Sequence, residues 1–367
     1  MLLAMAKATA MAGAHDGTGE VSRCRFDHVK RIVLRSEPWG CAMGREGHLY
    51  VAEVTKNRVV ALNRTTGSVV KAIQYWTDVD SFRGPSSIAF DEQGSMLVAD
   101  SNSGVVRVFE DESSPRRSIG HLQPSKRRHL PAPGNFSFPH MLSTVDDMLW
   151  VCDPESCCVQ ALYLNGTCKY LIHDQLTSTR VKVPVDGSFT RWRDLPKNAS
   201  ERVGSNVSEA YHMISTKLRA PNAVLVVKNT SISPLLLVVA DSGNHVLRFF
   251  DAAEGVELGA AVGGWGKFVG ELDYPTGIAM RSDGILLVAE SRNRRIQGFE
   301  ITRDAVRWLG TSCESDMRSV TSLCWDDNMQ DIWACDPQAK SVRNFRLILQ
   351  GRKSISLKKK QKQSTGR

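Results

Sequence analysis

Acidic side chains recur at one place in six related segments, and their type and spacing could do chemistry. They are Glu53, Asp100, Asp153, Asp241, Glu290 and Asp336, each directly after an apolar run. Carboxylates gathered at one level could bind a cation or a basic partner. Asp also accepts backbone N–H bonds in the turn that follows it, and the residues that follow here are turn formers. We expect this second, structural role.

Two residues that open apolar runs could bind a metal ion. His140 offers an imidazole suited to zinc, and Asn222 offers an amide oxygen suited to calcium. A catalytic zinc needs three protein ligands and calcium takes six or more oxygens, but the equivalent positions elsewhere hold Trp39, Ser86 and Thr276. We therefore expect no cofactor, with Zn or Ca at His140 or Asn222 as the alternative.

The cysteines do not form a zinc pattern. The chain has 9 of them, an odd count, and Cys152 occupies a position that is alanine in most of the related segments. Cys157 and Cys158 are adjacent, and neighbours on a strand point to opposite faces. We expect small hydrophobic side chains here, not ligands.

The six acidic residues mark a repeated β-meander. They lie 46 to 53 residues apart, except for 88 between Asp153 and Asp241. Six positions after each stands an apolar residue, and nine positions after each stands Leu or Phe. A short meander cannot bury both of its faces alone, and packing several around an axis solves this problem. The period therefore predicts an all-β, six-bladed propeller.

The domain boundaries follow from this repeat. We expect a flexible N-terminus over 1–28, the propeller over 29–350 and a disordered basic tail over 351–367. The run from Val29 to Leu34 has no nearby partner and is predicted to close the last blade as its outer strand, which removes exposed edges. The wide spacing after Asp153 indicates an insertion at about 176–219 rather than a degenerate blade.

The positive charge of the chain is concentrated in its last residues. The formal net charge is +8, but the last 17 residues carry seven basic side chains and no acidic one, so the body is close to neutral. Lys358, Lys359, Lys360 and Lys362 fit a nuclear-import signal or an anionic-surface tether, or a merely solubilising tail. Arg127 and Arg128 form the basic patch of the body. No apolar run is long enough to span a membrane.

Cysteine usage favours a reducing compartment, so we expect an intracellular protein of the cytoplasm or nucleus. Six Asn-x-Ser/Thr sequons keep a secretory location open; they begin at Asn63, Asn135, Asn165, Asn198, Asn206 and Asn229.

The segments PTGIAMRSDGILLVAESRNRRIQGF and VVADSGNHVLRFF resemble NHL repeats, whose propellers have six blades. The resemblance covers about 29–349 and is weaker in the third and sixth segments, where Cys152 and Cys335 replace alanine. It implies recognition by loops at one face, as in tripartite-motif ubiquitin ligases, which bind protein or RNA in this way. No RING or B-box pattern is present, so a role in a ubiquitin-type pathway would be that of a partner-binding component.

We therefore expect a monomeric, non-enzymatic scaffold that binds a protein partner, with RNA as the second ligand. Aromatic residues and Arg are favoured anchors at interfaces, so the candidate contacts are Trp39, Trp265, Arg292, Arg294, Arg127 and Arg128. The alternative is a metal-dependent propeller enzyme. His140 resembles one of the three zinc-binding histidines of amidating lyases, and Asn222 resembles a calcium ligand of gluconolactonase-like and strictosidine synthase-like hydrolases.

Overall fold

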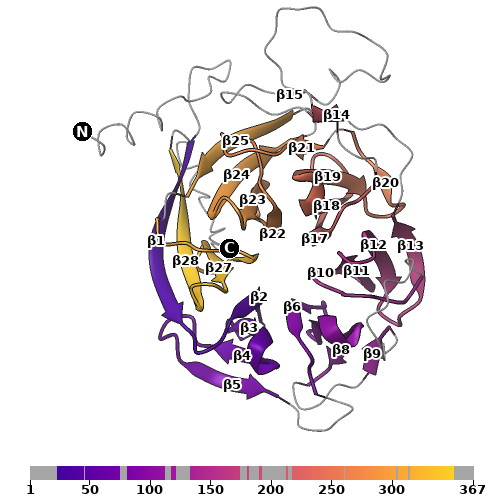
Figure 1. Ribbon diagram of the computed structural model, residues 1–367, viewed down its shortest axis with the longest axis vertical. Helices are drawn as coiled ribbons and strands as arrows, with labels where there is room; N and C mark the ends of the chain where they lie inside the picture. Colours follow the sequence, from indigo (N-terminus) through magenta and orange to yellow (C-terminus); the bar gives the residue numbers. More distant parts are fainter. Residues whose placement is uncertain are drawn as a thin grey trace, which may run out of the picture.

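The computed structural model describes residues 23–44, 46–74, 81–111, 117–120, 133–173, 180–181, 190–191, 212–213, 217–259, 261–302, 305–312 and 315–350. Six antiparallel sheets stand around a central axis as the blades of a propeller (Figure 1). In blades 1 to 5 consecutive strands pair as a meander, and in blade 6 the N-terminal strand joins the last three strands. The predicted all-β, six-bladed propeller is confirmed.

The first three blades each have four strands. Blade 1 consists of β2 (Pro38–Met43), β3 (Leu49–Glu53), β4 (Arg58–Leu62) and β5 (Val69–Ile73). Blade 2 consists of β6 (Pro85–Phe90), β7 (Met96–Asp100), β8 (Val105–Phe109) and β9 (Arg117–Ile119). Blade 3 consists of β10 (Leu142–Val145), β11 (Met148–Asp153), β12 (Cys158–Tyr163) and β13 (Cys168–Ile172).

The other three blades follow the same order from the axis outward. Blade 4 consists of β17 (Pro221–Lys228), β18 (Leu235–Asp241), β19 (Val246–Asp251) and β20 (Val256–Glu257), and β21 (Val262–Gly263) also pairs with β19. Blade 5 consists of β22 (Pro275–Met280), β23 (Ile285–Glu290), β24 (Arg295–Ile301) and β25 (Ala305–Thr311). Blade 6 consists of β26 (Ser322–Asp326), β27 (Asp331–Asp336), β28 (Ser341–Gln350) and the N-terminal strand β1 (Arg23–Val33).

The N-terminal strand closes the ring, as predicted. β1 pairs antiparallel with β28, from Arg23 opposite Gln350 to Val33 opposite Ser341, and the two strands lie side by side in Figure 1. The strand begins six residues earlier than the predicted Val29, which places its first residues inside the expected flexible N-terminus. Its early part is ordered by burial, because Cys24 and Phe26 pack into the hydrophobic cluster between blades 5 and 6.

The hydrophobic core lies between the blades. The second strand of each blade is covered on both sides, so its sequence is a continuous apolar run instead of an alternating one. All six residues of β23 and all six of β11 are buried. This covering explains why the apolar runs identified the blades so clearly in the sequence.

The interval between blade 3 and blade 4 contributes little regular structure among its described residues. β14 (Arg180–Val181) pairs with β16 (His212–Met213), and β15 (Thr190–Arg191) pairs with the outer strand β25 of blade 5. These two-residue strands form no four-stranded blade in the part of the interval that the structure describes.

The meanders give the propeller two distinct faces. The six acidic residues end the second strands, and we call the end of the ring where they lie the carboxylate face. The opposite end, where the first and second strand of each blade are joined by a hairpin, is called the hairpin face. Among the described residues, no helix is long and apolar enough to cross a membrane.

Candidate interaction face

The start of each inner strand lies beside the axis, at the carboxylate face. The residues at these six starts are Trp39, Ser86, His140, Asn222, Thr276 and Thr321, of which Trp39 is half-buried and the others are buried. Metal ligands or catalytic groups on the axis would occupy these positions. The hydrogen bonds of these side chains therefore decide whether they are available to bind a ligand.

His140 uses both of its ring nitrogens. The indole Nε1–H of Trp39 donates to His140 Nε2 at 2.6 Å, and His140 Nδ1 lies 2.9 Å from the carbonyl oxygen of Asn222. This fixes the neutral tautomer with the proton on Nδ1, because Nε2 accepts. Burial lowers the pKa of His140, which agrees with a neutral ring.

Most other axial positions bind the next blade round the ring. Ser86 Oγ donates to the carbonyl of His140 at 3.2 Å, and Thr276 Oγ1 donates to the carbonyl of Val320 at 2.7 Å. Thr321 Oγ1 donates to the carbonyl of Trp39 at 2.8 Å, so the ring of contacts passes across the junction between blade 6 and blade 1. These side chains hold adjacent blades together.

A metal ion bound to His140 would have to displace one of the two contacts of its ring. His140 has no free ring nitrogen, and the Asn222 side-chain nitrogen donates to the carbonyl of Ala220 at 3.2 Å. In the part of the chain that the structure describes, no three His, Cys, Asp or Glu side chains form a group that could hold a metal. These residues do not fit a three-ligand zinc site, and metal binding at His140 or Asn222 stays an untested prediction.

The six carboxylates are structural, as expected, but most of their backbone hydrogen bonds go to the segment before the inner strand and not to the following turn. Each is at most 1% exposed. In blades 2 to 6 each carboxylate accepts at least one hydrogen bond from the backbone just before the inner strand of its blade; the donors are Arg83, Ser137, Phe138, Arg219, Asp273, Arg318 and Ser319. Bonds to the following turn, as predicted, occur in addition at Asp153 and Asp336.

Arginines neutralise five of these buried carboxylates. The pairs are Arg58–Glu53, Arg107–Asp100, Arg248–Asp241, Arg295–Glu290 and Arg343–Asp336. Burial nevertheless raises the pKa of Asp241 to about 6, with Asn244 and Arg248 opposing the shift. In blade 3 the corresponding side chain is Gln160, which binds the backbone of Gly134 and Asn135 instead. The six carboxylates therefore have a structural role in the blades.

The cysteines behave largely as small hydrophobic residues. Cys152 is fully buried in β11. Cys157 is not on a strand as we expected, because its φ of 52° places it in the turn before β12. Eight cysteines are free among the described residues.

The loop between β21 and β22 presents large hydrophobic side chains to solvent. Trp265 is 67% exposed and Phe268 is 69% exposed, and the adjoining Val269 is also exposed. Most hydrophobic residues of this size are buried, so two neighbouring exposed aromatic rings are unusual and point to a contact surface.

This loop is held in place by hydrogen bonds between side chains and its backbone. The guanidinium of Arg295 donates to the carbonyls of Lys267 at 2.6 Å, Phe268 at 3.0 Å and Glu271 at 2.9 Å. Glu271 in turn accepts the backbone N–H of Phe268 at 3.0 Å, and Asn293 donates to the carbonyl of Gly266 at 2.8 Å. The aromatic rings therefore stand on an ordered loop.

Two predicted arginines lie beside this loop. The guanidinium of Arg292 lies 4.5 Å from the centre of the Tyr274 ring and 3.6 Å from Asp273 Oδ1, and it remains 58% exposed. Arg294 is exposed and has a φ of 55° in the turn after β23. The exposed residues Trp265, Lys267, Phe268, Val269, Arg292 and Arg294 will be called the aromatic patch.

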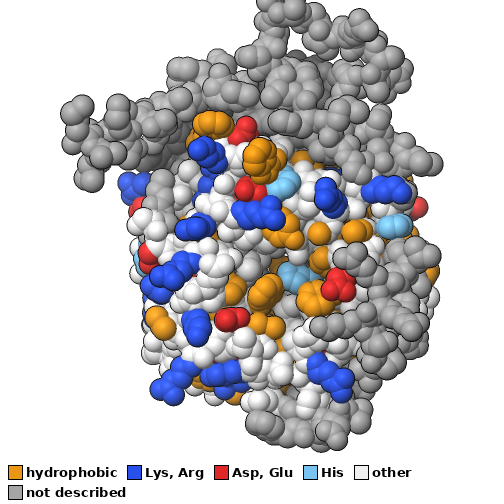
Figure 2. Space-filling model, in the orientation of Figure 1, with side chains coloured by type: hydrophobic (Ala, Val, Ile, Leu, Met, Phe, Trp, Pro, Cys, Tyr) orange, Lys and Arg blue, Asp and Glu red, His pale blue; other side chains and the backbone are white. Residues whose placement is uncertain are grey.

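The structure thus brings together Trp265, Arg292 and Arg294 but separates Trp39, which lies at the axis. Phe268 was missed, although the glycine-rich segment GGWGKF placed it next to Trp265. Arg127, Arg128 and the lysines of 358–362 lie outside the described residues. In the view of Figure 2, Lys and Arg side chains are spread over the described part of the face, and hydrophobic side chains surround a histidine at its centre.

Solved structures share this fold. A chain of a structure described as "Crystal Structure of Mitotic Checkpoint Complex" is 13% identical, with a TM-score of 0.53, and the match covers 88% of this chain and 93% of that one. A catalytically inactive virginiamycin B lyase from Staphylococcus aureus with quinupristin is 9% identical, with a TM-score of 0.52 and coverage of 89% and 100%. At these identities the similarity concerns the fold alone. No family model and no curated protein sequence matches the chain.

Proposed function

We propose that this protein is a non-enzymatic scaffold that binds a protein partner through the aromatic patch on its carboxylate face. The observation that carries the proposal is the ordered loop on which Trp265 and Phe268 are more than half exposed. Aromatic residues and arginine supply most of the binding energy at many interfaces, and an ordered loop loses little entropy on binding. The resemblance to NHL repeats supports recognition at this face.

The axial contacts support binding over catalysis. Trp39 and Asn222 occupy both ring nitrogens of His140, and Ser86, Thr276 and Thr321 bind neighbouring blades. A general base or a metal ligand needs a free nitrogen or oxygen directed at substrate. If the protein were a metal-dependent enzyme, the purified protein would contain stoichiometric zinc or calcium that is lost in His140→Ala or Asn222→Ala.

Protein is a better partner for this patch than RNA. Binding of RNA depends on rows of Lys and Arg for phosphates together with aromatic rings for stacking. The aromatic patch has three cations, of which Arg292 already faces Asp273, and it includes the aliphatic Val269. Apolar contact flanked by a few charges is typical of protein interfaces.

The test uses the full chain and the double variant Trp265→Ala/Phe268→Ala to capture binding proteins from cell extract. Quantitative mass spectrometry then measures how much of each protein is recovered. The matched control is Val69→Ala/Val256→Ala, since both valines are more than half exposed on other blades. We expect the same proteins to be recovered by wild type and control and to fall about tenfold or more with the patch variant. Equal recovery by all three would refute the proposal, and a loss after ribonuclease treatment would favour RNA.

A further inference from the structure

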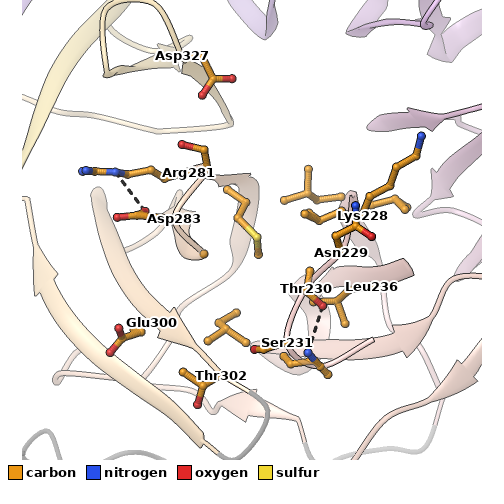
Figure 3. A pocket seen from close by; sticks show the side chains of 18 residues that line it. Lys228, Asn229, Thr230, Ser231, Leu236, Arg281, Asp283, Glu300, Thr302 and Asp327 are labelled. Atoms are coloured by element: carbon orange, nitrogen blue, oxygen red, sulfur yellow. Dashed lines mark hydrogen bonds and ion pairs between the residues drawn. The ribbon is translucent and has the colours of Figure 1, made fainter. Parts of the chain in front are cut away.

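A groove of about 600 Å³ lies on the hairpin face, away from the aromatic patch. Its sides come from the hairpin between β17 and β18 in blade 4 and from the turn between β22 and β23 in blade 5 (Figure 3). Figure 3 shows Lys228, Thr230 and Ser231 on one side and Arg281 and Glu300 on the other. The volume is in the range of ordinary ligand sites.

The floor of the groove is apolar. Val226, Leu236 and Ile301 are buried there, and Met280 and Ile232 are half-buried. Such a surface favours an occupant with aliphatic side chains, because an aliphatic side chain that leaves water for an apolar surface stabilises the bound state.

Carboxylates outnumber cations around this floor. Lys228 is shared between Glu92 at 2.8 Å and Asp146 at 2.6 Å, so this group carries a net negative charge. Arg281 pairs with Asp283 at 3.2 Å, and Arg307 pairs with Glu300. Asp327, which lines the groove from blade 6, is exposed. An occupant with positive charge is therefore favoured.

The end of this chain has the complementary sequence. After Gln350 come 17 residues that include Ile355 and Leu357, with Arg352 and Lys353 before them and three lysines directly after them. Aliphatic residues between cations match an apolar floor between carboxylates.

The last strand directs this segment toward the hairpin face. Asp331, at the start of β27, pairs with Asp326 across the hairpin and with Arg346 on β28. β28 then continues to Gln350, past the hairpin end of its blade. Asp327 of the same hairpin lines the groove, and the seven residues from Gln350 to Leu357 can extend about 23 Å.

We propose that the C-terminal segment of this chain docks in the groove of the same molecule. Ile355 and Leu357 lie on the apolar floor, and the lysines from Lys358 onward face the surrounding carboxylates. A docked segment withholds its lysines from an import receptor or an anionic surface, so release from the groove would expose them. The hairpin face would then regulate the basic tail independently of the aromatic patch.

Hydrogen exchange on the full chain tests this proposal. Ile355→Asp/Leu357→Asp removes the apolar contact, and Ser354→Asp/Ser356→Asp is the control that adds the same charge to the same segment. We expect several-fold faster exchange at 229–232 and 281–284 in the first variant and a clearly smaller change in the control, with both variants unchanged at 265–272. No substitution is made in the body, so its folding is not put at risk.

Three results would overturn the proposal. Equal exchange at 229–232 and 281–284 in wild type and both variants would mean that the segment does not dock. Equal acceleration by the two variants would mean that charge alone holds it, without the apolar floor. Protection that increases with protein concentration, together with a dimer in light scattering, would mean that the segment comes from a second copy.

Discussion

The indole of Trp39 in blade 1 donates a 2.6 Å hydrogen bond to His140 in blade 3, across the axis of the propeller. The two residues are 101 positions apart in the chain. Replacing Trp39 leaves the buried Nε2 of His140 without its partner, which costs about 1 to 3 kcal/mol, and replacing His140 leaves the indole N–H of the half-buried Trp39 without its acceptor. We expect Trp39→Phe and His140→Phe each to lower the free energy of unfolding, and the double variant to lose less than their sum. Additive losses in denaturant titrations would contradict the contact.

The pH dependence of stability should report the neutral state of His140. Burial lowers its pKa in the folded protein, so below the unfolded value of about 6.5 the unfolded chain binds more protons. Stability therefore falls as the pH decreases through this range. We expect denaturation midpoints of the wild type to fall more steeply from neutral to mildly acidic pH than those of His140→Gln. Asp241 has a raised pKa and acts in the opposite direction, but it is common to both proteins.

The buried pair Arg107–Asp100 should be sensitive to the loss of one partner. Its atoms are 2.9 Å apart, and the side chains are 3% and 0% exposed. Asp100→Asn leaves Arg107 charged and buried, which we expect to cost about 3 kcal/mol or more. The exposed pair Arg25–Asp27 provides the control, and Asp27→Asn should be close to neutral in the same thermal or chemical unfolding experiment.

The aromatic patch should lose its order when the guanidinium of Arg295 is removed. A lysine cannot reach the three carbonyls that Arg295 binds together, because its donors share a single nitrogen. We expect Arg295→Lys to speed hydrogen exchange over 265–271 and to weaken partner binding. The neighbouring Arg294→Lys makes the same chemical change on an exposed side chain and should alter the exchange of this loop little.

Gly40 lies at a close approach of blade 1 to blade 2. A Cβ at this position would be 2.3 Å from the carbonyl oxygen of Ser86, a backbone atom of blade 2. Because backbone cannot move aside as a flexible side chain can, Gly40→Ala should destabilise the protein by about 1 to 3 kcal/mol. An unchanged midpoint in urea would show that the two blades can separate without cost.

The sequence predicted the architecture well because the same physical requirement recurs in each blade. A buried second strand needs an apolar run, and the end of that run needs a carboxylate, so both were visible six times. The closing strand could be placed because Val29–Leu34 had no other partner. Its earlier residues Cys24 and Phe26 were missed because charged residues interrupt that part of the sequence.

The candidate site could be predicted only in part. Trp265 stands 27 positions before Arg292 in the chain, and it meets Arg292 and Arg294 because the loop before β22 docks on the turn after β23. The partners of the buried carboxylates were missed, although arginine stands seven positions after the acid in three blades and five after it in two. The contact of Trp39 with His140 had no local signal, since it depends on the closed ring.

Closure of the ring by β1 has a consequence for the order of assembly during synthesis. The first strand that the structure describes, Arg23–Val33, is paired only with β28, one of the last. β1 therefore stays unpaired until Ser341–Gln350 has left the ribosome. The outer strands of blades 1 to 5 pair with strands of their own blade, which are made earlier. A chain that ended before Ser341 would therefore leave β1 and β27 each with an unpaired edge.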